Sequence, residues 1–393
     1  MLDKLFEGLD NIYDEIVAIR RHLHQHPELS FKEFHTANYI ADYHEKLGSQ
    51  VRTNVGGNGV VAYLQGDKTG PTVALRADFD ALPIHEQTEV PFRSNNDGVM
   101  HACGHDGHTA TLLGLAKVLH SMKAEIEGTI VFLHQHAEEL PPGGAIDMIK
   151  DGCLDGVDVI FGTHLQAQTP LGEIGYRSGP LQAAPDRFDI KVKGEGGHGA
   201  YPHDTKDSIL IAGQLITNLQ QIVSRKVDPL ESAVVSVCSI EAKNPYNVIA
   251  DSVSLTGTVR TFKEDVRNMI ESEIERIVKG TCLVSDASYE YEYFRGYPTT
   301  VNHQAETEFV AALAPTVPGV QTVKETAPVM GGEDFSYYLQ QVKGTFFFTG
   351  AMNPAWEMAY PHHHPKFDID ERALLIAAKV LGSATLSYMK ENV

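Results

Sequence analysis

The segment TVALRADF, residues 72–79, is a short, β-branched and almost continuously apolar run. Runs of this kind form the buried strands of α/β sheets, which are apolar on both faces. Two later segments have the same character: GTIVFLHQH at residues 128–136 and VDVIFGTHL at residues 157–165. A helix is predicted at residues 106–121, between the first two runs. This alternation predicts an α/β domain built around a sheet.

The flanking segments complete the predicted sheet-centred domain. One amphipathic helix is predicted near the start of the chain by apolar residues at helical spacing, namely Leu5, Leu9, Ile12, Ile16 and Ile19. A second helix is expected near residues 33–48. Further along, we expect a helix near 304–315, a strand at 344–350 and a closing helix from Glu371. Residues 1–184 and 298–393 are therefore assigned to one domain.

Residues 185–297 have a different pattern of elements. In chain order we expect a strand at 186–194, a helix at 207–225, strands at 232–241 and 251–262, a helix at 264–280 and a strand at 287–294. The order strand-helix-strand-strand-helix-strand is that of a ferredoxin-like unit. A segment of about a hundred residues is long enough to fold as a domain. The sequence therefore predicts a smaller α+β domain inserted into the first.

Length and charge restrict the classes of function. A chain of 393 residues exceeds what one compact core usually spans, which agrees with two domains. The formal net charge of −20 argues against nucleic-acid and anionic membrane partners, because both are themselves negatively charged. No signal-peptide core or membrane-spanning run is visible, and the four cysteines are widely scattered. We therefore expect a cytoplasmic protein whose cysteines, apart from Cys103, are ordinary free thiols.

Acidic and imidazole side chains follow the three predicted strands. Asp78 and Asp80 lie at the end of the first, Glu138 and Glu139 follow the second, and His164 ends the third. Ligands collect beyond the carboxyl ends of the strands in open α/β sheets, so these positions form a candidate site. Each group also has a plain structural explanation: a turn cap, the start of a surface helix, or a satisfied core histidine. Their coincidence at three strand ends favours a functional site.

The segment MHACGHDGHTA, residues 100–110, places one glycine between Cys103 and His105. A thiol and an imidazole on such a turn can point at one centre. With the carboxylates and with HHHP at residues 362–365, they supply the ligand types that zinc and similar metals prefer. Cys103 could instead be a nucleophile activated by a histidine, but that hypothesis leaves Glu139, His164 and HHHP without a role. We favour the metal site.

Motifs along nearly the whole chain resemble one protein family. They are RADFDALPI (76–84), MHACGHDGH (100–108), HAEE (136–139), GTH (162–164), GGHGAYPH (196–203), NVIA (247–250), GTVRTF (257–262), GGEDF (331–335) and HHHPKFD (362–368). Their order is similar to that in one branch of the aminoacylase and carboxypeptidase type of di-metal amidohydrolases. That branch includes hippurate hydrolase, indole-acetyl-amino-acid hydrolases and N-acetyl-diaminopimelate deacetylase. The resemblance implies a catalytic domain with an inserted lid domain.

The resemblance also implies a set of metal ligands. For two divalent ions, zinc or manganese, these would be Cys103, His105, Glu139, His164 and His363. His363 is chosen because the family pattern is His, any residue, Pro, and Pro365 sets the register. In related branches an aspartate bridges the metals, and here the resemblance gives that role to the Cys103 thiolate.

Further residues are implied to act on the proton and the substrate. Glu138 would be the general base, and Asp80 would orient a metal ligand. His198 on the lid resembles the histidine that reaches the transition-state oxygen, commonly from a neighbouring subunit. Asn247 resembles a lid residue that faces substrate, although Ala250 stands where the family usually has proline. Weaker candidates for substrate contact are Arg260, Gly331 and Gly332.

The substrates of this branch are N-acyl amino acids, so we expect an N-acyl amino acid or a short peptide. A lid histidine that acts across subunits requires at least a homodimer, formed through the lid domain. Two rival functions are a metal-independent hydrolase that uses Cys103 and a catalytically silent metal-binding protein, which the presence of Glu138 disfavours. A dipeptidase or carboxypeptidase of the same metal class also stays open.

Overall fold

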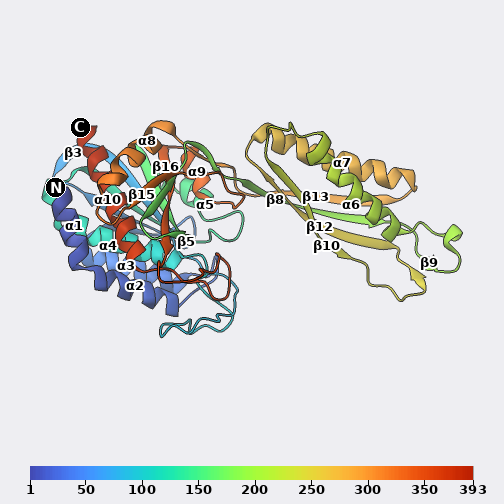
Figure 1. Cartoon of the computed structure of the whole chain (residues 1–393), viewed down its shortest axis with the longest axis horizontal. Helices are drawn as coiled ribbons and strands as arrows, with labels where there is room; N and C mark the ends of the chain where they lie inside the picture. The colour runs from blue at the N-terminus through green and yellow to red at the C-terminus, as the bar shows by residue number, and fades with distance from the viewer. Residues whose placement is uncertain (393) are drawn as a thin grey trace. The chain divides into compact units, whose positions relative to one another are not determined.

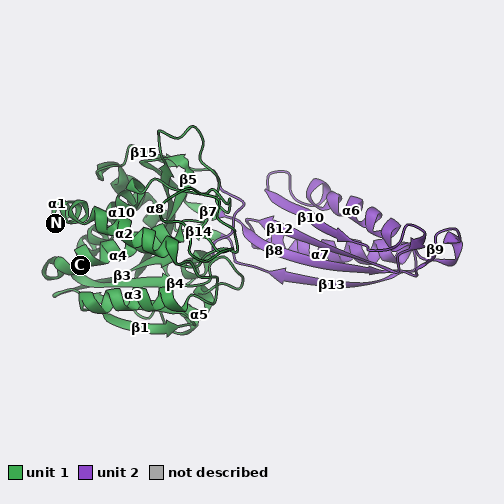
Figure 2. Ribbon diagram, turned by 90° about the horizontal axis from the view of Figure 1, so that it is seen from below, with its two compact units in different colours: residues 1–181, 300–327, 334–393 green, residues 182–299, 328–333 purple. Residues whose placement is uncertain are grey.

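The computed structural model of the chain describes residues 1–392 (Figure 1). The chain forms two compact units, coloured separately in Figure 2. The first contains residues 1–181, 300–327 and those from 334 onward, and the second contains 182–299 and 328–333. The expected boundaries, 1–184, 185–297 and 298–393, differ from these units mainly at residues 328–333. That segment joins the second unit because Val329 pairs with Gln182 and accepts a hydrogen bond from the Ala183 amide.

An eight-stranded sheet forms the centre of the first unit, in the order β1-β2-β4-β3-β5-β16-β6-β15. The four central strands β4, β3, β5 and β16 are parallel, while β1 and β2 are antiparallel to their neighbours. The bounds are β1 (Gln50–Val55), β2 (Gly59–Gln65), β3 (Lys68–Asp78), β4 (Glu127–Gln135), β5 (Val159–Pro170), β6 (Glu173–Tyr176), β15 (Thr322–Glu325) and β16 (Lys343–Met352). A separate short pair is β7 (Gly179–Gln182) with β14 (Thr300–Asn302).

Helices cover both faces of this sheet (Figure 1). One face carries α1 (Leu2–Asn11), α2 (Tyr13–Gln25), α3 (Phe34–Leu47), α4 (His105–Ser121), α8 (Gln304–Leu313) and α10 (Arg372–Glu391). The other carries α5 (Ala145–Lys150) and α9 (Phe335–Leu339). Single turns of 3-10 helix lie at η1 (Lys123–Glu125) and η3 (Ala314–Thr316).

Alternate residues of the central strands pack against different helices. In β3, Val73 and Leu75 join the core cluster on one face, and Ala74 joins the cluster on the other. Ile130 and Val131 of β4 divide in the same way. Because side chains alternate across a strand, a strand buried on both faces must be apolar throughout. This explains the continuous apolar runs in the sequence.

Two local predictions were wrong. The N-terminal segment forms two helices rather than one, because Ile12 takes a non-helical conformation with φ −109° and ψ 14°. The apolar residues keep their helical spacing on both sides of Ile12, so the sequence pattern does not indicate the break. The break lets α1 pack against α10 while α2 packs against α4. The strand expected at residues 157–165 continues, as β5, to Pro170.

The second unit is an antiparallel sheet of four strands in the order β10-β12-β8-β13, with two helices. Its main elements are β8 (Ala184–Lys193), α6 (Ser208–Arg225), β10 (Ala233–Glu241), β12 (Ser252–Thr261), α7 (Glu264–Val284) and β13 (Ser288–Arg295). Smaller ones are β9 (Gly197–His198), η2 (Pro202–Asp204) and β11 (Val248–Ile249). Chain order and sheet order are those of a ferredoxin-like unit. The predicted fold, an α/β sheet-centred domain with an inserted ferredoxin-like lid, is confirmed.

Across residues 1–392, no helix combines the length and the apolar character that crossing a lipid bilayer requires.

Candidate metal centre

Three parallel strands bring the predicted polar residues to one edge of the large sheet. β3 ends at Asp78, β4 ends three residues before Glu138, and β5 carries His164. All three side chains are buried. Their common edge lies at the carboxyl ends of the parallel strands, where α/β sheets bind ligands.

The turn between Cys103 and His105 depends on Gly104. This residue adopts φ 97°, a left-handed conformation that glycine takes without steric cost, and α4 begins immediately after it. Nδ1 of His105 lies 3.0 Å from the carbonyl oxygen of Asp80 and 3.2 Å from its Oδ1. When Nδ1–H donates to Asp80, the lone pair of Nε2 is directed away from it, as metal-ligating histidines require.

Carboxylates surround the second ring nitrogen of His105. Its Nε2 lies 3.7 Å from Asp78 Oδ2, 3.9 Å from Glu138 Oε2 and 3.8 Å from Glu139 Oε1. Although burial lowers the pKa of His105, the negative charges of Asp78 and Asp80 raise it to about 10. The centre therefore has an excess of negative charge that favours a cation.

Cys103 lies in an environment that disfavours its thiolate in the absence of a cation. Burial, and then the charges of Glu139, Glu138 and Asp78, raise the pKa of the Cys103 thiol well above its usual value. A nucleophilic cysteine needs the opposite shift. A divalent cation would reverse this balance, because it is the largest local charge and deprotonates a coordinating thiol. The electrostatics thus favour a metal ligand over a nucleophile.

His164 presents one nitrogen to the Cys103 sulfur. Its Nδ1 lies 2.8 Å from the carbonyl oxygen of Leu165, to which Nδ1–H donates. Nε2 then keeps its lone pair and lies 3.5 Å from Sγ of Cys103. This is the second imidazole that is oriented by a backbone or carboxylate acceptor.

Two groups of potential metal ligands share Cys103. Its Sγ lies with atoms of His105 and Glu139 in one group and with atoms of His164 and His362 in the other, all within 4.8 Å of one another inside each group. The buried atom His105 Nε2 has no hydrogen-bond partner among residues 1–392. Buried polar atoms seldom lack a partner, so this donor set fits cations. One sulfur shared by two groups fits a pair of them.

The histidine run contributes two imidazoles to this region. His363, selected from the sequence, has φ 65° and places Nε2 3.2 Å from Glu139 Oε1. His362, which sequence reasoning missed, packs its ring 5.0 Å from that of His164 and has a buried Nδ1 without a partner in the described chain. Adjacent histidines in a loop carry no periodic signal that would separate their roles.

Hydrogen bonds occupy both nitrogens of His108, another residue of the motif. Nδ1 lies 2.6 Å from Asp78 Oδ1, and Nε2 accepts from the Leu165 amide at 2.9 Å. Arg76 joins the same network: it donates to Asp78 at 2.6 Å and to Asp334 of the GGEDF motif at 2.9 Å. Sequence reasoning gave His108 and Asp334 no role. Their role is to hold Asp78 in a buried network of charges.

A second buried network starts at Asp106. Its Oδ2 accepts from Arg20 Nε at 2.9 Å and lies 2.8 Å from His24 Nδ1. Arg20 also binds Asp368 at 3.0 Å, and His24 Nε2 lies 3.3 Å from Glu86. The network connects the first turn of α4 to α2 and to two loops. No local sequence pattern indicates it.

The predicted residues of the lid fall into two groups within the second unit. His198 and Asn247 are neighbours, because β9 pairs with β11 and the Gly199 amide donates to the Asn247 carbonyl at 2.8 Å. Both side chains are exposed. Arg260 donates to the carbonyl of Met330 at 3.1 Å, next to Gly331 and Gly332.

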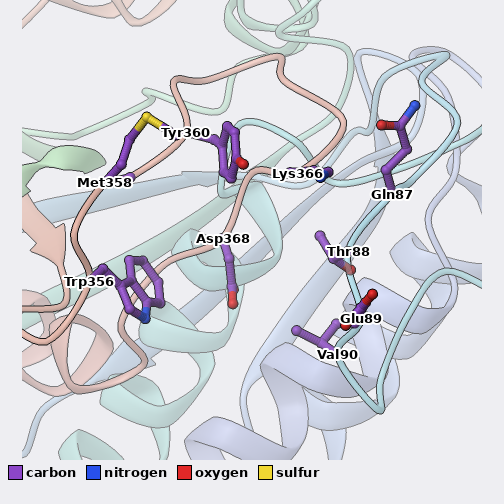
Figure 3. Close-up of a pocket in the computed structure, with 10 residues that line it drawn as sticks. Gln87, Thr88, Glu89, Val90, Trp356, Met358, Tyr360, Lys366 and Asp368 are labelled. Atoms are coloured by element: carbon purple, nitrogen blue, oxygen red, sulfur yellow. The ribbon is translucent and has the colours of Figure 1, made fainter.

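A cavity of about 460 Å³ is lined by Tyr360 and Lys366, which flank the histidine run in the sequence (Figure 3). Gln87–Val90 form one wall, and Trp356, Met358 and Tyr360 lie across from them (Figure 3). The walls are joined where the Gln87 amide donates to the carbonyl of Pro365 at 2.8 Å. Its size is typical of a small-molecule site.

The chain is similar to proteins that act on amide bonds. The family model described as Peptidase family M20/M25/M40 matches residues 74–387. YhaA of Bacillus subtilis (strain 168), which is named as an amidohydrolase, is 60% identical over 380 residues, or 97% of this chain and 96% of that protein. An N-acyl-L-amino acid amidohydrolase of Geobacillus stearothermophilus is 50% identical over 295 residues, or 75% of this chain and 80% of that one.

A solved structure has the same fold. The YxeP protein of Bacillus subtilis, described as a dinuclear metal binding peptidase from the M20 family, superposes with a TM-score of 0.83 at 35% identity. The match covers 98% of this chain and 100% of that chain.

Proposed function

Because the chain belongs to peptidase family M20/M25/M40, whose members act on amide or peptide bonds, we propose a specific reaction for it. In this proposal the enzyme uses two divalent ions to hydrolyse N-acyl amino acids or small peptides. The observation that carries this proposal is the Cys103 sulfur, which is shared by two groups of potential ligands. The N-acyl amino acid class is supported by the name of the relative from Geobacillus stearothermophilus.

We propose that the ions are zinc or manganese, held by Cys103, His105, Glu139, His164 and His363. Thiolate and imidazole ligands favour zinc, and carboxylates accommodate manganese. When bound, such ions polarise an amide carbonyl and lower the pKa of water. His362 is an alternative to His363 as the fifth ligand. Elemental analysis of H362A and H363A distinguishes the two: the variant that lacks the ligand should lose metal, and the other variant should retain it.

Glu138 is the proposed proton carrier. Its side chain is buried, and its Oε2 lies 3.9 Å from His105 Nε2. From this position a carboxylate can accept the proton of the attacking water and return it to the departing amine. The neighbouring Glu139 has its backbone amide fixed on Asp80 Oδ2 at 3.0 Å. The two adjacent glutamates thereby divide proton transfer and metal binding.

Residues of the second unit are proposed to act on the substrate. His198 would stabilise the negative charge that develops on the carbonyl oxygen, an effect worth roughly 3–4 kcal/mol for a well-placed donor. Asn247, Arg260 and the glycines Gly331 and Gly332 would contact the substrate. For H198A we expect a lower kcat at unchanged metal content, and unchanged kinetics would exclude the role.

The cavity of about 460 Å³ is the proposed site for an apolar acyl group. Trp356, Met358 and Tyr360 offer flat or flexible apolar surfaces. The ring of Tyr360 stacks on His364 at 4.5 Å, which connects the cavity to the run that carries His363. We expect W356A to raise KM for N-benzoyl amino acids more than for N-acetyl amino acids.

The test of the proposed function is a turnover screen after reconstitution with zinc or manganese. Substrates are N-acetyl, N-benzoyl and N-indole-acetyl amino acids and short peptides. E138Q should keep its metal and lose at least about a hundredfold in kcat, whereas the exposed-surface control E7Q should match the unmodified enzyme. Full activity in E138Q would refute the role of Glu138. Activity that survives complete chelation would favour the cysteine hydrolase.

The lid is the proposed surface for a homodimer or higher homo-oligomer. Large apolar side chains are exposed on its two helices: Leu210 is 61% exposed on α6, and Val284 is 84% exposed on α7. With Ile209 and Gly213 they line a groove of about 620 Å³. Exposed apolar patches often mark interfaces. A change from oligomer to monomer in L210E/V284E, measured by light scattering, is the expected result.

A further inference from the structure

The loop that joins α2 to α3 contacts the turn that presents Glu138. In this loop Glu33 is completely buried. Its Oε1 accepts hydrogen bonds from the backbone amides of Ala137 and Phe31, each at 2.9 Å, and its Oε2 accepts from Asn58 Nδ2 at 2.9 Å. A buried carboxylate thus binds the amide directly before the proposed proton carrier, 104 positions away in the sequence.

Capping of the adjacent helix does not explain Glu33. It immediately precedes α3, yet its side chain makes no capping hydrogen bond. Glu28 serves that end instead, because its carboxylate accepts from the amides of His35 and Thr36 at 3.2 and 2.7 Å. Two glutamates in one loop therefore have different partners, one local and one distant.

The turn that Glu33 contacts has a strained backbone. Ala137 takes φ 53°, a left-handed conformation that is uncommon for residues other than glycine. Strained residues persist only where their surroundings hold them, and they concentrate at functional sites. The loop supplies such support: Phe31 packs its ring 5.8 Å from His136, and Glu33 binds the Ala137 amide. Beyond Ala137, the chain continues directly into Glu138 and Glu139.

We infer that Glu33 is a positioning residue, whose carboxylate holds Ala137 in its left-handed conformation and thereby orients Glu138 toward the reacting water. This inference rests on the proposed function of Glu138. A carboxylate offers acceptor atoms to the two amides and to Asn58 as they stand, whereas glutamine would present an N–H group to one of these three donors.

The experiment compares E33Q with E28Q as its matched control. Misplacement of a catalytic group by about 1 Å can cost a hundredfold in rate. For E33Q we therefore expect kcat to fall about 10- to 100-fold, with KM and metal content unchanged within about twofold. E28Q changes a glutamate of the same loop whose carboxylate accepts hydrogen bonds from α3, so its kcat should stay within about twofold of the unmodified enzyme.

A second substitution tests the link through Ala137. Glycine adopts left-handed conformations without steric cost, so A137G in the E33Q background should recover at least about threefold in kcat. A crystal structure of E33Q supplies a readout that does not depend on turnover: Ala137 should leave its positive φ. Should E33Q fail to fold, N58A, which removes one donor to Glu33, should lower kcat at unchanged KM.

Normal kcat in E33Q, an equal loss in E28Q, or loss of metal together with activity would overturn the inference. So would an Ala137 that keeps its φ in E33Q, or unchanged kcat in N58A. These outcomes differ from failure of the proposed function, which would appear as full activity in E138Q.

Discussion

Substitution of Arg20 tests whether the ion network beneath the HACGHDGH motif supports the first unit. The Arg20 side chain is 1% exposed. It lies 2.9 Å from Asp106, 3.0 Å from Asp368 and 3.2 Å from Glu371, and its guanidinium stacks on Phe92. The variant R20M keeps most of the apolar stem but removes the charge. It leaves the carboxylate of Asp106 buried without its cation.

The expected loss follows from which partners remain. Breaking a buried ion pair on one side typically costs about 3–5 kcal/mol, because the other charge stays buried. Asp106 keeps His24 at 2.8 Å, and Asp368 and Glu371 are partly open to solvent, with 27% and 16% of their side chains exposed. We therefore expect the lower end of that range, a decrease of about 3 kcal/mol in the free energy of unfolding.

The assay is urea unfolding at pH 7.5, with R21M as the control. Arg21 is the next residue of the same helix and pairs with Glu371 at 2.7 Å, but its side chain is 45% exposed. An exposed pair contributes at most about 1 kcal/mol. The variant R20M/D106N should recover part of the loss, because it removes the unpaired charge. A loss below about 1 kcal/mol in R20M, or equal losses in R20M and R21M, would show that the buried ion network does not stabilise the first unit.

Two further predictions concern other buried residues. The variant C103A should lose bound metal and turnover, whereas C282A, which replaces another buried cysteine, should keep both; elemental analysis that finds full metal in active C103A would contradict this. His44 and His134 form a buried pair with their Nε2 atoms 3.0 Å apart, and burial lowers the pKa of His44 to about 3 and that of His134 well below its usual value. The unfolded chain therefore binds protons below about pH 6.5 that the folded chain does not, so stability should fall by about 1.4 kcal/mol per histidine between pH 7.5 and 5.5. Urea unfolding at the two pH values should show a smaller fall in H44L/H134L, and an unchanged fall would show that the pair does not titrate in this way.

The central strands and the polar residues that follow them could be predicted from the sequence. Strands buried on both faces are apolar throughout, as β3 shows, and parallel strands end at one edge. The positions of Asp78, Glu138 and His164 at this edge could therefore be predicted from the order of the strands alone. The glycine between Cys103 and His105 likewise predicted a turn. In the structure this residue, Gly104, has the positive φ that the turn requires.

The networks around the site could not be predicted, because their partners lie far apart in the sequence. Arg76 and Asp334 are separated by 258 positions, and Arg20 and Asp106 by 86. Neither pair belongs to a periodic pattern. The choice between His362 and His363 had a different obstacle: adjacent residues in a loop have no spacing signal, so only backbone geometry distinguishes them.

Anomalous X-ray scattering from crystals of the purified enzyme, recorded at the zinc and manganese absorption edges, locates the proposed ions. We expect two peaks in each subunit, both about 2.3 Å from Sγ of Cys103, one on the side of His105 and the other on the side of His164. Fully active crystals with no peak near Cys103 would contradict this expectation.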